Sequence, residues 1–334
     1  MKKVIQLILF GTVFLFSGCG VLESDDKTFD AGPILFISDE SGTNQLYSMD
    51  EDGNNITQLT NDPNFPIYEA KWSPDGQKIA VISEVGDSND YSEYRRAVFI
   101  MDADGSNRYQ LTPQWITVQD SVRGALNYAG ALGITWKPNS KKIIFSRLMA
   151  PESFGNYDVF LINLDGTNEK RITKTIDLTE GTYDWSSDSD AFWGVVVDYS
   201  AQDSSGQGIQ YTRLVLVDLD GEILKSWGEP GEKWQHPAYS QSESKIAYIY
   251  VNKSQNRDVY IINSDGTRRS NLTNGMCQFS APIAWSQDNK QILLDCYNQN
   301  ADGHRIFIIN ADGTGVKNIT PFKDVFLQAQ SWRR

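Results

Sequence analysis

The chain has 334 residues, with 43 Asp and Glu against 30 Lys and Arg, which gives a formal net charge of −13. Aromatic residues make up 12% of it, so there is enough apolar bulk for a core, and a disordered acidic chain is excluded. The acidic balance argues against nucleic-acid binding, because phosphate contacts need a surplus of Lys and Arg. Two His leave little room for a multi-histidine metal site, and we expect no cofactor.

The first 18 residues have the features of a signal peptide. Lys2 and Lys3 precede an apolar run over 4–16, and Ser17, Gly18 and Cys19 follow. The run is shorter than the ~20 residues that a membrane span needs. Small residues before a cysteine resemble the bacterial lipobox, although Phe16 departs from its usual small aliphatic residue. This resemblance implies that residues 1–18 are removed and that Cys19 is lipidated.

The polar, acidic residues 19–32 form a short tether in this interpretation. We therefore expect an extracytoplasmic protein that is lipid-anchored to a bacterial membrane, on the periplasmic side of the outer membrane or at the cell surface. A plain signal peptide and a membrane anchor are the alternatives.

One pattern then recurs six times: an apolar pair, Asp or Asn, a spacer, Asp-Gly, and in five copies a later Leu-Thr or Ile-Thr. The copies are 45 to 61 residues apart, which fits the four-stranded blade of a propeller with loop insertions. The aspartates of the Asp-Gly steps are Asp52, Asp104, Asp165, Asp220, Asp265 and Asp312.

A second pattern is an aromatic residue, a polar turn and an apolar residue seven places on, which predicts a β-hairpin. The first repeat has a strand at 33–38 but no aromatic residue before it, whereas the chain ends on a strand at about 326–332 that contains Trp332. This strand would complete the first blade and close the ring. We therefore predict an all-β, six-bladed propeller over 33–334. The hairpin pairs are Trp72 with Ile79, Trp136 with Ile143, Trp185 with Phe192, Tyr239 with Ile246, and Trp285 with Ile292.

Repeats of the form W-S-P-D-G…I-x-F…D-x-D-G…L-T, complete at residues 72–76, resemble the WD40-like propeller repeat of the TolB family. The resemblance covers 33–334 and implies a non-enzymatic interaction module of the bacterial envelope, with another envelope protein or a peptide as its partner. TolB proteins also carry an N-terminal α/β domain, for which the tether leaves no room, so we expect the propeller alone, as a monomer. A cell-surface carbohydrate-binding propeller is the alternative, and an enzyme is less favoured.

The Asp-Gly steps resemble fragments of a calcium loop, but the spacing does not support one. Aligned on Gly, five of six first ligand positions and all six twelfth positions hold residues that cannot bind the ion. The Asp or Asn is therefore expected to cap a tight turn and the Gly to adopt a positive φ. The sequence also lacks G-x-S-x-G and H-E-x-x-H, so we expect no catalytic and no metal-binding residue. His304 is expected to be a solvated loop residue.

Cys277 and Cys296 fall on neighbouring strands of the sixth blade, where pairing of Ile283 with Ile292 would bring them near each other. A disulfide between them is expected outside the cytoplasm, and two free buried thiols are the alternative.

Long loops at 84–96, 113–130, 147–157 and 198–212 share one face of the predicted propeller, at the mouth of its channel. Exposed aromatic residues beside Arg are typical of binding surfaces, so this long-loop face is the predicted contact surface. The alternative for each residue is that it packs beneath its own loop. The candidates are Tyr91, Tyr94, Arg95, Arg96, Trp115, Tyr128, Phe154, Tyr157, Tyr199, Tyr211, Trp234 and His236.

Overall fold

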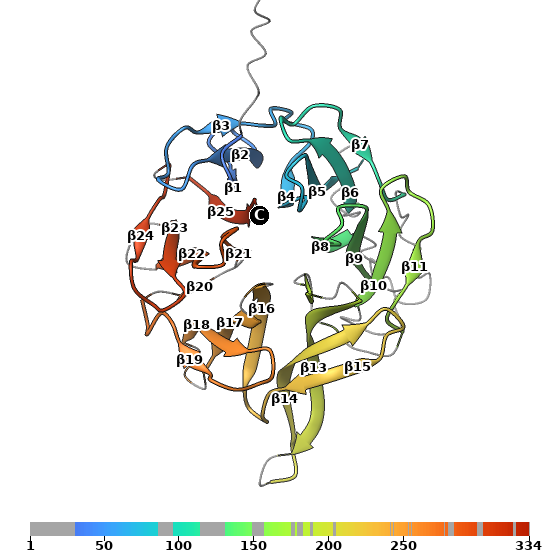
Figure 1. Cartoon of the computed structure of the whole chain (residues 1–334), viewed down its shortest axis with the longest axis vertical. Coiled ribbons are helices and arrows are strands. Elements are labelled where there is room, and N and C mark those ends of the chain that lie inside the picture. The colour runs from blue at the N-terminus through green and yellow to red at the C-terminus, as the bar shows by residue number, and fades with distance from the viewer. Residues whose placement is uncertain are drawn as a thin grey trace, which may run out of the picture. The chain divides into compact units, whose positions relative to one another are not determined.

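Six antiparallel sheets follow one another around a ring, as the computed structural model in Figure 1 shows. Each sheet is one blade of a six-bladed β-propeller, so the predicted fold is confirmed. No residue that the structure describes lies in a helix long and apolar enough to cross a membrane. The described residues are 31–85, 96–113, 131–148, 157–174, 178, 183–187, 190–202, 205–240, 242, 244–252, 254, 256–276, 278–279, 284–298, 303–322 and 325–333.

Each blade has four strands, which are ordered below from the axis of the ring outward. Blade 1 consists of β25 (Leu327–Trp332), β1 (Ile34–Ser38), β2 (Gln45–Met49) and β3 (Thr57–Gln58). Blade 2 consists of β4 (Ile67–Trp72), β5 (Lys78–Glu84), β6 (Arg96–Asp102) and β7 (Tyr109–Gln110). Blade 3 consists of β8 (Ala131–Trp136), β9 (Lys142–Leu148), β10 (Tyr157–Asn163) and β11 (Lys170–Arg171).

Blades 4 to 6 repeat this order. Blade 4 consists of β12 (Asp184–Trp185), β13 (Ala191–Gln202), β14 (Gly208–Asp218) and β15 (Ile223–Trp227). Blade 5 consists of β16 (Lys233–Ser240), β17 (Lys245–Val251), β18 (Arg257–Asn263) and β19 (Ser270–Asn271). Blade 6 has an inner strand in two pieces, β20 (Gln278–Phe279) and β21 (Ala284–Trp285), followed by β22 (Gln291–Asn298), β23 (Gly303–Asn310) and β24 (Lys317–Asn318).

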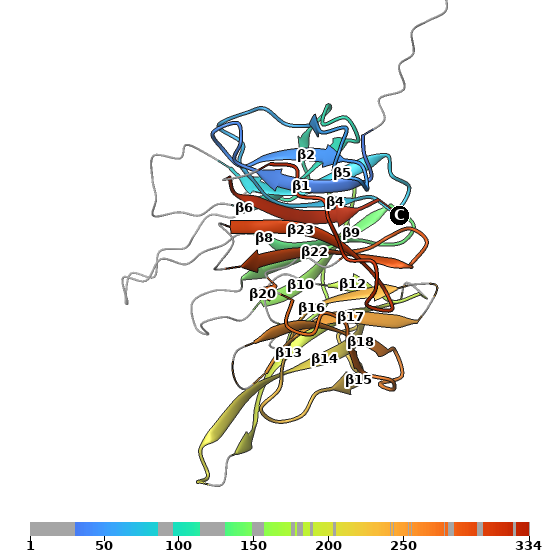
Figure 2. The same ribbon diagram turned by 90° about the vertical axis from the view of Figure 1, so that its left-hand side faces the viewer.

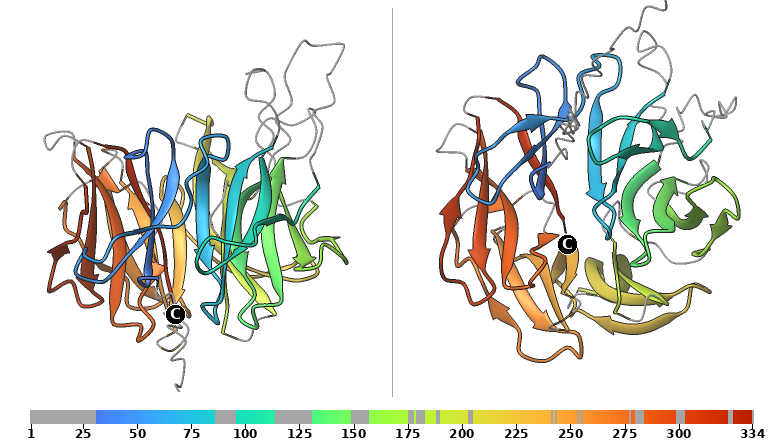
Figure 3. Two further views of the ribbon diagram at one scale, coloured as in Figure 1. Left: turned by 90° about the horizontal axis from the view of Figure 1, so that it is seen from above. Right: turned by 45° about the horizontal axis from the view of Figure 1, so that its top comes forward.

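The strand register confirms the predicted hairpins and the ring closure. Trp72 lies opposite Ile79, and the other four predicted aromatic pairs are matched in the same way. In blade 1, Trp332 lies opposite Ile34, and the N–H of Arg333 donates to the main-chain oxygen of Pro33 at 2.7 Å. The chain therefore ends on an inner strand, near the centre of the ring in Figures 1 and 3.

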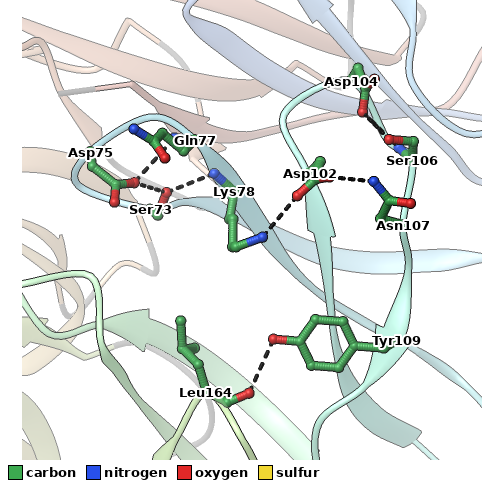
Figure 4. Close-up of polar contacts among 10 residues, drawn as sticks. All are labelled: Ser73, Asp75, Gln77, Lys78, Asp102, Asp104, Ser106, Asn107, Tyr109 and Leu164. Carbon is green, nitrogen blue, oxygen red and sulfur yellow. Dashed lines mark hydrogen bonds and ion pairs between the residues drawn. The ribbon is translucent and has the colours of Figure 1, made fainter.

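The Asp-Gly turns have the structural role that the sequence predicts. In blade 2, the Asp104 carboxylate accepts bonds from the N–H and the hydroxyl of Ser106, at 2.9 and 2.6 Å (Figure 4). Gly105 has a φ of +82°, and a Cβ on it would lie 2.0 Å from the main-chain oxygen of Leu59 in blade 1. Glycine is therefore needed for the turn and for the close approach of the neighbouring blade.

The threonine of each Leu-Thr or Ile-Thr step also has a structural role. In blade 2, Thr112 is 1% exposed, and its hydroxyl accepts the N–H of Val98 at 3.0 Å. This bond satisfies a buried donor of the third strand, which would otherwise cost free energy. Thr60, Thr173, Thr273 and Thr320 make the same bond in their blades, at 2.9 to 3.0 Å.

A recurring side chain fastens the outer strand of one blade to the turn of the next. This side chain belongs to the residue five places after the aspartate of the Asp-Gly step. It donates to the main-chain oxygen of the residue that precedes the equivalent aspartate in the next blade, and we call this contact a clamp. Figure 4 shows one case, Tyr109 to Leu164 at 3.1 Å. Thr57 and Ser270, which are too short for this contact, fill the position in blades 1 and 5. The other three clamps join Lys170 to Leu219, Lys225 to Ser264 and Lys317 to Glu51, at 2.8, 3.4 and 2.9 Å.

Two details of the prediction are wrong. The residues near 198–212 are not wholly an irregular loop, because β13 and β14 continue as a paired two-stranded arm as far as Gln202 and Gly208. The arm projects beyond the other blades in Figures 1 and 2. In blade 6, Ile292 lies opposite Trp285, which rules out the expected pairing of Ile283 with Ile292.

Candidate functional site

The inner strands of four blades each contain a β-bulge. The pairing of the inner strand with the next strand shifts register between Ile67 and Glu69 in β4, between Leu132 and Ile134 in β8, and between Gln235 and Ala238 in β16. In blade 1 the shift in the pairing of β25 with β1 lies between Leu35 and Phe36. A bulge inserts one residue and redirects side chains, so the strict alternation of a strand ends there.

Neighbouring blades exchange side-chain bonds beside these bulges. Each inner strand is the edge of its sheet and leaves backbone N–H groups without a partner strand. The side-chain oxygen of Gln330 in blade 1 accepts the N–H of Ala70 in blade 2 at 3.0 Å. The Glu69 carboxylate of blade 2 accepts the N–H of Ile134 in blade 3 at 3.1 Å. In blade 4, Asp184 does the same for the N–H of Tyr239 in blade 5, at 2.8 Å.

A lysine in blade 2 and a histidine in blade 5 influence each other across the axis of the ring. Lys71 in blade 2 donates from Nζ to the main-chain oxygen of Gln330, at 3.0 Å. Burial, together with the positive charges of Lys71 and Arg257, lowers the pKa of His236 in blade 5 to about 4. Blades 2 and 5 are three steps apart in a ring of six, so this repulsion acts through the axis. His236 and Lys71 therefore both face the axis.

Two polar atoms in this region are buried without a hydrogen-bond partner among the described residues, Nδ1 of His236 and Nε2 of Gln330. Gln330 is 1% exposed, and its side-chain oxygen is already bonded to Ala70, so Nε2 is a donor with no acceptor among the described residues. His236 has a φ of +49°, a left-handed conformation that is uncommon for residues other than glycine. We call Glu69, Lys71, His236 and Gln330 the axial site.

Glu69 is the carboxylate of the axial site. Burial raises its pKa, while the charge of Lys71 and the N–H groups of Ile134 and Gly133 act in the opposite direction. Protein surrounds the carboxylate, yet the residue keeps some contact with solvent. The axial site thus combines a lysine, a neutral histidine, an amide donor with no partner among the described residues, and a carboxylate whose ionisation is disfavoured by burial.

Arg96 lies on the long-loop side of the axial site. Its guanidinium carbon is 3.9 Å from the centre of the Tyr68 ring, and the Tyr68 hydroxyl donates to Glu84. Burial raises the pKa of Tyr68 to about 12, and its bond to Glu84 acts in the same direction. The positive charge of Arg96 also lowers the pKa of Glu69. This predicted contact residue is therefore coupled to the axial site.

The predicted aromatic candidates divide into exposed and buried residues. Tyr199, on the arm, is 62% exposed. Tyr157, Tyr211 and Trp234 are 9%, 7% and 2% exposed, so the expectation that they are exposed is wrong. They belong to β10, β14 and β16 rather than to loops, and their side chains pack inward. Tyr91, Tyr94, Arg95, Trp115, Tyr128 and Phe154 lie outside the described residues.

Trp234 belongs to an aromatic cluster that the sequence did not predict. It stacks on Tyr248 with the ring centres 4.1 Å apart, and its indole N–H donates to Glu232 at 3.0 Å. The Arg269 guanidinium lies 4.4 Å from the Tyr250 ring centre and bonds to Glu232 at 2.6 Å. These contacts give the cluster a packing role in blade 5.

His304 is not simply solvated, as the sequence suggested. Its Nδ1 lies 2.9 Å from a carboxylate oxygen of Asp295, a residue that is 1% exposed. The hydrogen bond to Asp295 raises the pKa of His304, although burial acts in the other direction. Within the described part of the chain, no group of three or more His, Cys, Asp or Glu side chains could hold a metal ion.

The structure describes one of the two cysteines of the predicted disulfide. Cys296 is 3% exposed and disulfide-bonded, and it lies opposite Phe279. Cys277 lies outside the described residues, so its pairing with Cys296 stays a prediction. Cys19, the predicted lipidation site, is also outside them.

Comparison with known proteins shows what this chain is similar to in sequence. No family model matches it. It is 27% identical over 142 residues to the Protein TolB homolog of Chlorobaculum tepidum, a match that covers 42% of this chain and 26% of that protein. It is 31% identical over 83 residues to the Tol-Pal system protein TolB of Hahella chejuensis, covering 24% and 17%. The matches thus span about a quarter or less of these relatives' length.

Solved structures extend the likeness to most of the chain. TolB from Acinetobacter baumannii superimposes with a TM-score of 0.66 at 18% identity, over 90% of this chain and 67% of that one. The putative TolB from Agrobacterium tumefaciens gives 0.59 at 14% identity, over 89% and 96%. Puromycin hydrolase gives 0.56 at 11% identity, over 87% and 45%. At these identities the likeness concerns the fold, and it includes an enzyme. The chain resembles TolB proteins in both sequence and fold.

Proposed function

We propose that this chain is a membrane-tethered, extracytoplasmic propeller that binds an envelope protein, or a peptide segment of one, at the long-loop end of its axis. It works as a monomer and catalyses no reaction. Cys19 carries the lipid that holds it to a membrane, and residues 19–32 form the tether.

The axial site is the observation that carries this proposal. Three backbone N–H groups beside it are capped by side chains of the neighbouring blade, whereas Nδ1 of His236 and Nε2 of Gln330 have no partner in the part of the chain that the structure describes. Buried polar atoms without partners cost about 1–3 kcal/mol each, so a ligand that bonds to them recovers free energy on binding. The resemblance to proteins named for the Tol-Pal system supports an envelope partner.

Site-specific photo-crosslinking in cells tests the proposal. A crosslinking amino acid at position 96 faces the proposed contact surface, and one at position 264 lies in a turn at the other end of the blades as a control. We expect one envelope protein to be captured from position 96 alone, and to be lost when Lys71→Met is added. Equal capture from both positions would contradict the proposal, and so would glycan binding that requires the tryptophans.

The anchor needs its own test. Cys19→Ser should move the chain from the membrane fraction to the soluble fraction, because a protein without acyl chains has no hydrophobic attachment. Membrane association that survives this substitution would contradict lipidation at Cys19. Mass spectrometry of the N-terminal peptide checks the same point directly.

A further inference from the structure

We propose that the axial site binds a carboxylate group, and that this carboxylate belongs to an acidic residue of the peptide that the propeller captures. The inference rests on the proposed function and names the chemistry by which the partner is recognised. It concerns Lys71, His236 and Gln330, which come from three blades.

The available hydrogen-bond chemistry favours a ligand that accepts bonds. Gln330 offers Nε2, which has no partner among the described residues, and beside it the Lys71 ammonium brings a positive charge, with Nζ 3.0 Å from the main-chain oxygen of Gln330. Nδ1 of His236 also has no described partner and can carry a proton. A carboxylate has two oxygens and about four acceptor sites, so it suits several donors that converge from different strands.

The charges around the axis also favour an anion. Lys71 and Arg257 act on His236, and Lys71 and Arg96 act on Glu69. Three cations therefore influence this region, and burial disfavours the ionised form of Glu69. These cations attract an incoming carboxylate.

The strands packed against β16 carry further charged residues. Asp184 on β12 accepts the N–H of Tyr239, and Arg213 on β14 pairs with Asp198 on β13 at 2.8 Å. Lys245 lies opposite Ser240 at the far end of β16. The groups that act on His236 are thus the cations Lys71 and Arg257.

His236 gives the site a reporter, because a bound carboxylate favours the protonated imidazole. An opposite charge within about 4–6 Å commonly moves a pKa by one unit or more. Carboxylate binding should therefore raise the His236 pKa from its low value in the free chain. The chain has only two histidines, so NMR of the full-length, histidine-labelled protein can follow His236, with His304→Gln to assign the two signals.

The test compares two blocked tripeptides at constant ionic strength, acetyl-Ala-Glu-Ala-amide and its isostere acetyl-Ala-Gln-Ala-amide. We expect the glutamate peptide to shift the His236 signal saturably, to raise its titration midpoint by about one unit, and to bind at least about tenfold more tightly. Equal binding of the two peptides overturns the proposal. Binding of digalacturonate without binding of the glutamate peptide also overturns it, because the carboxylate would then come from a sugar.

Variants locate the site. Lys71→Met should weaken binding of the glutamate peptide about tenfold, whereas Lys225→Met should not change it, although Lys225 also donates from Nζ to a main-chain oxygen. His236→Asn should weaken binding with the fold intact, because Asn tolerates the left-handed backbone. Equal effects of the two lysine variants overturn the proposal. If crosslinking succeeds and the peptides leave His236 unchanged, only this inference fails; if the peptides bind and crosslinking fails, only the envelope partner fails.

Discussion

Nζ of Lys71 lies 3.0 Å from the main-chain oxygen of Gln330, and this bond joins the inner strand of blade 2 to the strand that completes blade 1. Two further bonds run beside it, from the N–H of Ala70 to the Gln330 side chain at 3.0 Å and from the N–H of Trp72 to the Ser331 hydroxyl at 3.2 Å. The last strand of the chain is therefore held by β1 on one side and by β4 on the other.

Gly105→Ala should destabilise the junction between blades 1 and 2. A Cβ at this position would lie 2.0 Å from the main-chain oxygen of Leu59, which side-chain rotation cannot relieve. Gly206→Ala is the matched control, since Gly206 has the same φ of +82° and has nothing within 4 Å of its added Cβ. We expect Gly206→Ala to cost about 1–2 kcal/mol from backbone strain alone, and Gly105→Ala to cost clearly more, by urea unfolding. Equal losses would show that the blades yield at this contact.

Thr112→Val should remove about 1–3 kcal/mol of unfolding free energy. The substitution keeps the shape of the side chain but leaves the N–H of Val98 buried without its acceptor. Thr112→Ser retains the hydroxyl and should cost less, because only a methyl group is lost. The comparison is made by urea unfolding at pH 7.5, with unchanged m values expected. A valine variant as stable as the wild type would mean that Val98 finds another acceptor.

His236 should make the protein less stable in acid. Its pKa is lowered from an ordinary value of 6.5 to about 4, so between these values the unfolded chain binds a proton that the folded chain does not. Stability is therefore lost as the pH falls below 6.5, by about 2–3 kcal/mol at pH 4.5. His236→Asn should lose that much less than the wild type between pH 7.5 and 4.5, measured by urea unfolding.

His304 provides a control, because its effect on stability should depend on pH with the opposite sign. Its pKa is raised by the bond to Asp295, so its contribution is complete below pH 6.5 and fades as the pH rises through the folded-state pKa. His304→Gln should therefore lose stability relative to the wild type in acid and approach it at alkaline pH. If both histidine variants respond to pH in the same direction, one of the two assignments is wrong.

Thr57→Lys should stabilise the protein slightly. Thr57 occupies the position at which Lys170, Lys225 and Lys317 reach the turn of the next blade, and a lysine there would reach the main-chain oxygen of Ala103. The gain should be about 0.2–1 kcal/mol, because the contact is solvent-exposed. Lys170→Met removes an existing clamp and should lose a similar amount in the same urea assay. A destabilising Thr57→Lys would show that blades 1 and 2 are spaced differently.

The fold was predictable from the sequence because hairpin register follows from turn length. The seven-residue spacing from Trp72 to Ile79 recurs in five repeats, and it fixes which residues face each other. The missing aromatic residue of the first repeat and the unpaired Trp332 pointed to the closing strand. The arm beyond Asp198 was missed because its Ser, Gly and Gln residues have weak strand propensity, although the backbone pairs there.

The axial site was harder to predict because its members come from blades that meet only in three dimensions. His236 was selected for its place near the predicted channel mouth, whereas Glu69, Lys71 and Gln330 were not selected at all. Each lies one to three places before the aromatic residue that ends an inner strand, but other blades also have polar residues there, such as Thr135 and Asp184, so position alone does not single them out. Strand bulges, which aim these side chains, leave little trace in a sequence.

The pairing of β25 with β1 also constrains how the protein is made. Leu327 and Ser38 are neighbours in the ring but lie far apart in the sequence, so this contact cannot form until Leu327 has been synthesised. Until then, blade 1 lacks its inner strand and Ala70 and Trp72 lack their acceptors. Contacts between such distant residues fold slowly. A chain that loses its last eight residues should therefore be a substrate for proteases over its whole length.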